Sequence, residues 1–333
     1  MKKIFAVMML CAATAMAQQY IIKFATLAPE GSTWMNIMKE MDQAVRKESG
    51  GRAGFKLYAG GVAGDETDVL RKIRLGQYHS AGFTGVGMGK IAPAVRLLDA
   101  PFYFKDHDEV DMVLEKFDGE FRKAFEDNGF VLLGWAEVGN VFVFTNKPIT
   151  KVQDLNGVKM WQWEGDPVAE AAFKALNLKT IPLSISDVLT SLQTGLIDGV
   201  YTSPLAAVSL QWFTAVKYMF NVPLTNSAGA VLIVKKEFDR YPQDIQDILL
   251  RNGKSFMRKL TLRSREDNEK SLVSLQKSKI VFTKPASAKA AEEYDEIGRT
   301  ARKSMAGKLY SEDLLARFDN ALVEYRAAHG GKK

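Results

Sequence analysis

Hydrophobic and polar positions follow two different periods along most of the chain. Short apolar runs bounded by glycine, proline or polar residues predict strands, and longer segments with apolar residues three and four apart predict helices. The predicted strands are 20–26, 55–58, 80–84, 130–135, 141–145, 157–161, 228–234 and 279–283. Helical segments follow most of the early strands, and helical packing is expected over 286–328. Strands that alternate with helices favour an α/β fold.

Several predicted helices have recognisable ends. Ser32 stands where a side-chain cap is expected, directly before a segment with helical apolar spacing. The amphipathic segment 65–75 ends at Gly76, a residue typical of helix C-termini. Ser186 is expected to cap a further helix that stops at Gly195.

One predicted helix is much longer than the others. From Pro242 to Lys277 a rough helical period continues, and Gly253 is the only helix-weakening residue within it. At ~1.5 Å per residue the helix would be about 50 Å long, more than one small domain needs. We therefore expect two lobes braced by this helix: 18–140 and 230–260 as lobe I, 141–229 and 278–333 as lobe II, and 242–277 across both.

The first 17 residues predict a signal peptide. Lys2 and Lys3 precede a short apolar stretch, and 15–17 is a small-x-small cleavage site, so cleavage is expected after Ala17 and the protein in the periplasm. Cys11 follows a leucine and not a small residue, which argues against a lipid-modified cysteine.

The amino-acid composition argues against several classes of function. The chain has one cysteine, inside the predicted leader, so we expect neither a disulfide nor a thiolate metal site in the exported protein. The formal net charge is +6, but basic and acidic residues are interleaved, as in 258–270, which does not favour nucleic-acid binding. After the leader no apolar run is long enough to cross a bilayer, so a membrane partner would be met from solution.

Five short motifs appear in a particular order and spacing. They are ATLAP at 25–29, GGVAGDE at 60–66, LDAPFYF at 98–104, DLNGVKM at 154–160 and LQTGLIDG at 192–199. In these segments, from about residue 24 to 275, the chain resembles the solute-binding subunits of TRAP (tripartite ATP-independent periplasmic) transporters, in the dicarboxylate-binding, DctP-like branch.

The resemblance implies a periplasmic-binding-protein type II-like fold, in which two α/β lobes close on a small ligand. It also implies delivery of that ligand to TRAP-type membrane permease subunits, with no catalysis and no cofactor. Most members bind organic acids and clamp a carboxylate with an arginine directly after the Gly-x-Lys-x segment, a geometry in which two charge-assisted hydrogen bonds form at once.

The chain departs from the family at the ligand. The arginine position is Trp161, and a second cationic position common in the family is Asn140. A buried carboxylate without a cationic partner is costly, whereas tryptophan offers an apolar face. We therefore expect a more apolar or aromatic ligand. Two alternatives stay open: a cation held by tryptophan faces near Glu137 or Glu164, and a monocarboxylate held by backbone amides at a helix start.

The candidate ligand-binding residues come from these positions and from the strand ends around them. Each also has a plain structural interpretation, such as core packing for the aromatic residues and a favourable helix-start charge for the glutamate in 60–66. The candidates are Trp161, Trp163, Tyr201, Asn140, Glu137, Trp212, Phe83 and Glu66.

Other chemistry finds little support in the sequence. Residues 84–90 resemble a phosphate-binding loop but lack its first glycine and its final Ser or Thr, and the glycines are expected in a turn beside the cleft. The acidic cluster 106–111 fits a helix start capped by Asp106 better than a metal site. No catalytic set is recognisable. The remaining alternatives are a sensor that docks on a receptor and a secreted enzyme.

Overall fold

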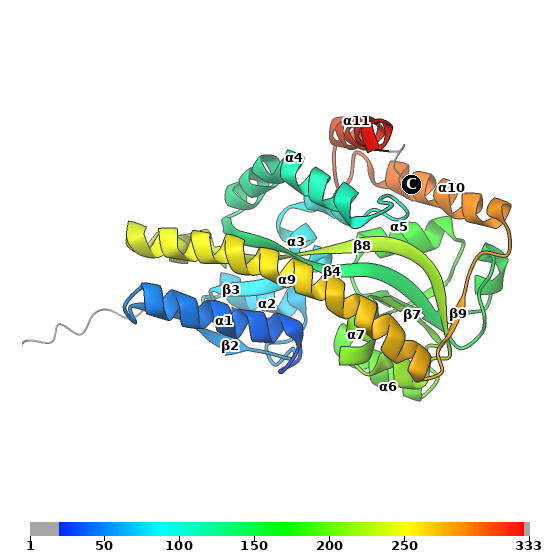
Figure 1. Ribbon diagram of the computed structural model, residues 1–333, viewed down its shortest axis with the longest axis horizontal. Coiled ribbons are helices and arrows are strands. Elements are labelled where there is room, and N and C mark those ends of the chain that lie inside the picture. The colour runs from blue at the N-terminus through cyan, green and yellow to red at the C-terminus, as the bar shows by residue number, and fades with distance from the viewer. Residues whose placement is uncertain (1–19, 330–333) are drawn as a thin grey trace, which may run out of the picture.

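A mixed nine-stranded sheet forms the centre of the computed structural model, which describes residues 20–329 (Figure 1). The strand order is β2-β1-β3-β8-β4-β7-β5-β6, and β9 pairs with β8. The strands are β1 Tyr20–Ala25, β2 Ala53–Tyr58, β3 Ser80–Thr84, β4 Phe130–Thr145, β5 Met160–Trp163, β6 Thr180–Leu183, β7 Gly199–Thr202, β8 Tyr218–Val234 and β9 Val281–Thr283.

Helices pack around this sheet. The α-helices are α1 Thr33–Glu48, α2 Glu66–Arg74, α3 Gly85–Ile91, α4 His107–Asp127, α5 Pro167–Ala175, α6 Val188–Gln193, α7 Pro204–Ser209, α8 Lys235–Phe238, α9 Gln243–Lys277, α10 Ala288–Met305 and α11 Glu312–His329. Four 3-10 helices join them: η1 Pro93–Asp99, η2 Val152–Leu155, η3 Ile185–Asp187 and η4 Trp212–Ala215. The α/β fold with a long helix is confirmed.

Two long antiparallel strands connect the halves of the molecule. β8 pairs with β3 near its end, whereas the end of β4 pairs with β7. The two predicted strands 130–135 and 141–145 are therefore one strand, and 228–234 is only the second half of β8. Register shifts along the β4–β8 pair, one of them between Glu137 and Gly139, bend the ribbon as it crosses.

The long helix α9 spans the molecule as predicted. It packs against β4 and also against α1 and α7, which belong to opposite halves (Figure 1, yellow). The structure explains Gly253 inside it. A Cβ there would lie 2.5 Å from the carbonyl oxygen of Leu133, and a Cβ on Gly134 would lie 2.5 Å from the carbonyl oxygen of Gly253. Helix and strand thus approach backbone to backbone.

Two predicted helix starts are confirmed, one is wrong, and one helix forms where a turn was expected. Ser32 and Asp106 accept hydrogen bonds from backbone N–H groups at the starts of α1 and α4. Ser186 caps no helix, because it lies inside η3 and α6 begins at Val188 without a side-chain cap. Residues 85–91 form the helix α3, capped by Thr84, where a turn was expected.

The C-terminal helices contact both halves. α10 packs against α5, and α11 packs against α4. The predicted lobes place 278–333 in lobe II and α4 in lobe I, and these boundaries stay a prediction. No helix between residues 20 and 329 is long and apolar enough to cross a membrane. The predicted leader lies outside the described residues.

Candidate ligand-binding site

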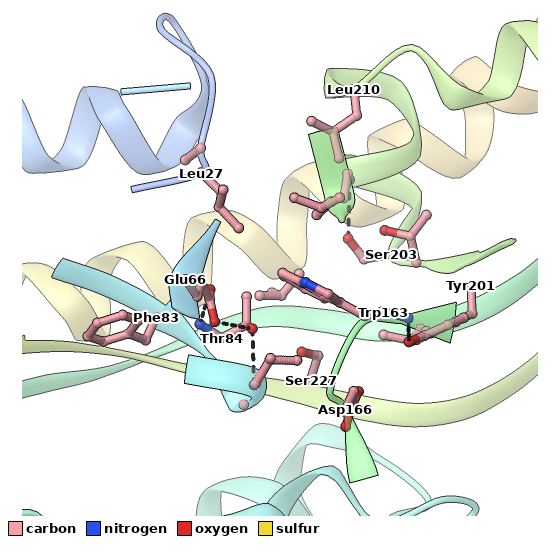
Figure 2. Close-up of a pocket in the computed structure, with 18 of the residues that line it drawn as sticks. Leu27, Glu66, Phe83, Thr84, Trp163, Asp166, Tyr201, Ser203, Leu210 and Ser227 are labelled. Atoms are coloured by element: carbon pink, nitrogen blue, oxygen red, sulfur yellow. Dashed lines mark hydrogen bonds between the residues drawn. The ribbon is translucent and has the colours of Figure 1, made fainter. Parts of the chain in front are cut away.

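A cavity of about 340 Å³ lies where the two halves of the molecule meet. Residues from both halves line it: one wall includes Glu66, Phe83 and Thr84, and the other includes Trp163 and Tyr201 (Figure 2). The volume suits a small organic molecule, because pockets for such ligands begin at about 300 Å³.

Aromatic side chains dominate the second wall. Trp161 is only 1% exposed and stacks on Tyr201, with ring centroids 4.9 Å apart, while Trp212 meets it edge-on at 5.2 Å. The indole N–H of Trp161 donates to the carbonyl of Leu183 at 3.0 Å. The Tyr201 hydroxyl accepts from the backbone N–H of Trp163 at 3.1 Å. These bonds fix the rings in place, so the wall is preformed.

The opposite wall is organised by the carboxyl group of Glu66. It accepts hydrogen bonds from the backbone N–H and the hydroxyl of Thr84, at 2.7 and 3.0 Å (Figure 2). The backbone N–H of Gly87 donates to it at 2.6 Å. Burial raises the pKa of Glu66 to about 7, although these donors oppose the shift. Phe83 is buried beside it at the end of β3.

Three charged residues that were not among the predicted site residues also line the cavity. Arg96, Asp99 and Asp166 are each no more than 5% exposed. The Nη1 atom of Arg96 lies 3.0 Å from Asp99 Oδ2, and its Nη2 atom lies 2.7 Å from Asp166 Oδ1. Burial raises the pKa of Asp99 to about 6, although Arg96 and the backbone N–H of Ala228 oppose the shift.

Weak indications of this cluster exist in the sequence. Arg96 interrupts the apolar run 95–98, and a charge in such a run is expected to be buried and paired. Asp166 precedes Pro167, a pair typical of a helix N-cap followed by its first residue. Neither indication shows that Arg96 pairs with Asp166, which lies 70 residues further along the chain.

The charges around the cavity are strongly unequal. Among the described residues that line it, Arg96 is the only base, whereas four carboxyl groups are present: Asp65, Glu66, Asp99 and Asp166. Both terminal nitrogens of Arg96 already lie beside carboxylates. A carboxylate ligand would therefore have to compete with protein carboxylates for the terminal nitrogens of Arg96.

Hydrogen bonds across the cavity hold the halves together. Asp65, at the start of α2, accepts from the indole N–H of Trp163, the hydroxyl of Ser184 and the backbone N–H of Ile185. Lys90 donates to the carbonyl of Gly165 at 2.9 Å. These contacts, together with the Arg96–Asp166 pair, describe a closed arrangement.

Two predicted site residues lie elsewhere. Glu137 and Asn140, on β4, do not line the cavity. Glu137 pairs with Arg265 of α9 at 2.6 Å and lies 3.1 Å from His107, while Asn226 donates to both Glu137 and Asn140. Burial alone would raise the pKa of Glu137, but these basic partners outweigh it and lower the pKa. This network ties the long helix to the sheet.

The other six candidates line the cavity together: Trp161, Trp163, Tyr201, Trp212, Phe83 and Glu66. Their contact with a ligand stays a prediction. Glu164, named as a partner for a cationic ligand, is exposed and does not line it. In the described part of the chain no group of three or more His, Cys, Asp or Glu side chains is arranged to hold a metal ion.

Residues 24–306 match the family model of the bacterial extracellular solute-binding proteins, family 7 (DctP). The chain belongs to this family. The resemblance to TRAP solute-binding subunits is thereby confirmed, and with it a periplasmic solute-binding class of protein.

Individual relatives agree with this assignment. A solute-binding protein from Verminephrobacter eiseniae is 29% identical over 70% of each chain. The C4-dicarboxylate-binding periplasmic protein DctP of Rhodobacter capsulatus is 23% identical over 91% of each. The sugar acid binding protein DctPAm of Advenella mimigardefordensis, solved with galactonate, shares the fold with a TM-score of 0.85, 21% identity, and coverage of 91% of this chain and 98% of that one.

Proposed function

We propose that the protein captures a small organic solute in the cavity between its two halves and delivers it to TRAP-type membrane permease subunits. Residues 1–17 would direct export and be removed after Ala17. Family membership supports the transport role. Catalysis is not part of the proposal, because the family consists of solute-binding proteins.

The ligand is proposed to be uncharged and apolar or aromatic, unlike the acids named for the relatives. The observation that carries this is the lining of the cavity. Trp161 occupies the family's arginine position and is stacked into an aromatic wall, and Arg96 is paired with protein carboxylates. An organic acid would lose its hydration without gaining a cationic partner, whereas an aromatic ring would gain contact with Trp163 and Tyr201.

The test is to identify what the protein carries. Protein purified gently from its native periplasm would be denatured, and the released small molecules identified by mass spectrometry. We expect an uncharged molecule with a ring or other apolar body, recovered in about one copy per chain. A dicarboxylate or sugar acid as the released molecule would contradict the ligand class but leave the transport role intact. Conversion of the molecule on incubation with the protein would contradict the absence of catalysis.

A further inference from the structure

The guanidinium of Arg96 is occupied from both halves of the molecule. Asp99 is three residues away on η1, within the same half. Asp166 belongs to the other half, where it caps α5 by accepting from the backbone N–H of Val168 at 3.0 Å. Asp166 Oδ1 receives this N–H and Arg96 Nη2 at 2.7 Å. The protein's own carboxylate therefore stands where a ligand carboxylate would have to stand to meet Nη2.

The backbone is shaped to allow this pairing. A Cβ on Gly85 would lie 1.7 Å from Asp99 Oδ2 and 2.3 Å from Arg96 Nη1, so only glycine at the start of α3 leaves room for the pair. All three charged residues are buried at the cavity wall, each no more than 5% exposed. A buried ion pair is costly to form, because both charged groups lose their hydration. Removing one partner is also costly, because the other charge is then buried alone.

We propose that Asp166 is the specificity-determining residue that excludes carboxylate ligands, by occupying the guanidinium group of Arg96. The inference deepens the proposed function, since it rests on this cavity being the ligand site. An incoming carboxylate would have to displace Asp166, whose carboxylate would then be left without its cationic partner in a poorly solvated space. An uncharged ligand meets no such penalty.

The first test is chemical rescue with acetate. Asp166→Ala removes the carboxylate and leaves space beside Arg96 that acetate can fill. Thermal unfolding would be measured in increasing sodium acetate, with sodium chloride at equal ionic strength as the reference. The matched control is Asp106→Ala, which removes another N-capping aspartate, bonded to the Glu109 N–H at 3.0 Å and outside the cavity lining.

For Asp166→Ala we expect a lowered Tm that acetate raises with the logarithm of its concentration, because the anion binds only the folded protein. Wild type and Asp106→Ala should respond equally to acetate and chloride. Acetate that stabilises Asp166→Ala no more than chloride does would overturn the inference, because it would show that a free carboxylate does not take the vacated place.

A second variant covers the case in which Asp166→Ala does not fold. Asp166→Asn keeps an acceptor for the Val168 N–H and loses only the negative charge. Its affinities for phenylacetate and phenylacetamide, a pair of similar shape and different charge, would be measured by calorimetry. Relative to wild type, the phenylacetate affinity should rise about tenfold or more, as expected for a charge-assisted pair with Arg96.

Unchanged phenylacetate affinity in Asp166→Asn would overturn the inference, as would a wild type that prefers phenylacetate to phenylacetamide. A different experiment would contradict the proposed function. A protein that releases no solute from its native periplasm would refute solute capture and leave the acetate rescue of Asp166→Ala as it stands.

Discussion

The indole N–H of Trp163 donates to both carboxylate oxygens of Asp65, at 3.1 and 3.2 Å. The bond joins β5 in one half of the molecule to the start of α2 in the other. Because Trp163 also lines the cavity, the orientation of one ligand-facing ring depends on the two halves being closed. The hydroxyl of Ser184 and the N–H of Ile185 donate to the same carboxylate and extend this connection.

Asp65→Ala should therefore favour an open form. Three donors from the other half lose their acceptor, which should weaken closure by roughly 2 kcal/mol. Small-angle X-ray scattering should show a larger radius of gyration than in wild type, and Trp163→Phe, which removes one donor, should have a smaller effect. The control is Asp68→Ala, on the same helix but paired with Arg71 at the surface. Identical scattering from Asp65→Ala and wild type would show that these bonds do not hold the halves together.

Trp161→Phe should weaken ligand binding as well as stability. The change removes the hydrogen bond to the Leu183 carbonyl and part of the stack on Tyr201, so we expect the free energy of unfolding to fall by about 1–2 kcal/mol. Ligand affinity, measured by calorimetry with the solute recovered from the native protein, should fall about tenfold.

Trp135→Phe is the matched control for that experiment. Trp135 also donates its indole N–H, to Asp118 at 2.6 Å, but does not line the cavity. It should lose similar stability and keep the wild-type ligand affinity. Equal losses of affinity in both variants would place Trp161 in a purely structural role.

Much of the fold could be predicted because strands and helices here have strong local patterns. β3 and the long helix were predicted to within one residue at each end. The strands β4 and β8 were not, because polar residues interrupt their apolar pattern. Glu137 and Asn226 lie mid-strand, and their side chains form hydrogen bonds with partners distant in the sequence, such as Arg265 for Glu137. Local periodicity carries no information on such pairs.

The ligand-binding site, like the fold, could be predicted only in part. The aromatic wall could be predicted because Trp161 occupies a motif position with a known neighbourhood in related chains. The pairing of Arg96 with Asp166 could not, because it forms between two halves of the molecule across 70 residues of sequence. Glu137 was expected at the ligand by positional analogy with the family. In the structure its carboxylate pairs with Arg265 of α9 and lies beside His107 of α4, away from the cavity.

The buried carboxyl group of Glu66 should make stability depend on pH. Its pKa is about 7 in the folded protein, against an ordinary value of 4.5, so folding favours its protonated form. This contribution is fully present below pH 4.5 and is lost as the pH rises to about 7, a change of about 2–3 kcal/mol. Urea unfolding at pH 5 and pH 8 should show wild type losing more stability than Glu66→Gln, which cannot ionise. The exposed Glu170→Gln should follow wild type, and parallel profiles for wild type and Glu66→Gln would contradict the buried-acid interpretation.

The contact between α9 and β4 makes opposite predictions for two helical glycines. Replacing glycine by alanine within a helix ordinarily stabilises it by about 0.5–1 kcal/mol. At Gly119 of α4 a new Cβ meets nothing within 4 Å, so Gly119→Ala should raise the Tm. At Gly253 the Cβ would lie 2.5 Å from the Leu133 carbonyl oxygen and 2.8 Å from the Leu133 Cβ, so α9 would have to move away from the sheet. Gly253→Ala should lower the Tm despite its better helix propensity. A rise in Tm for both variants in calorimetry would mean that the helix does not rest on the strand backbone at this point.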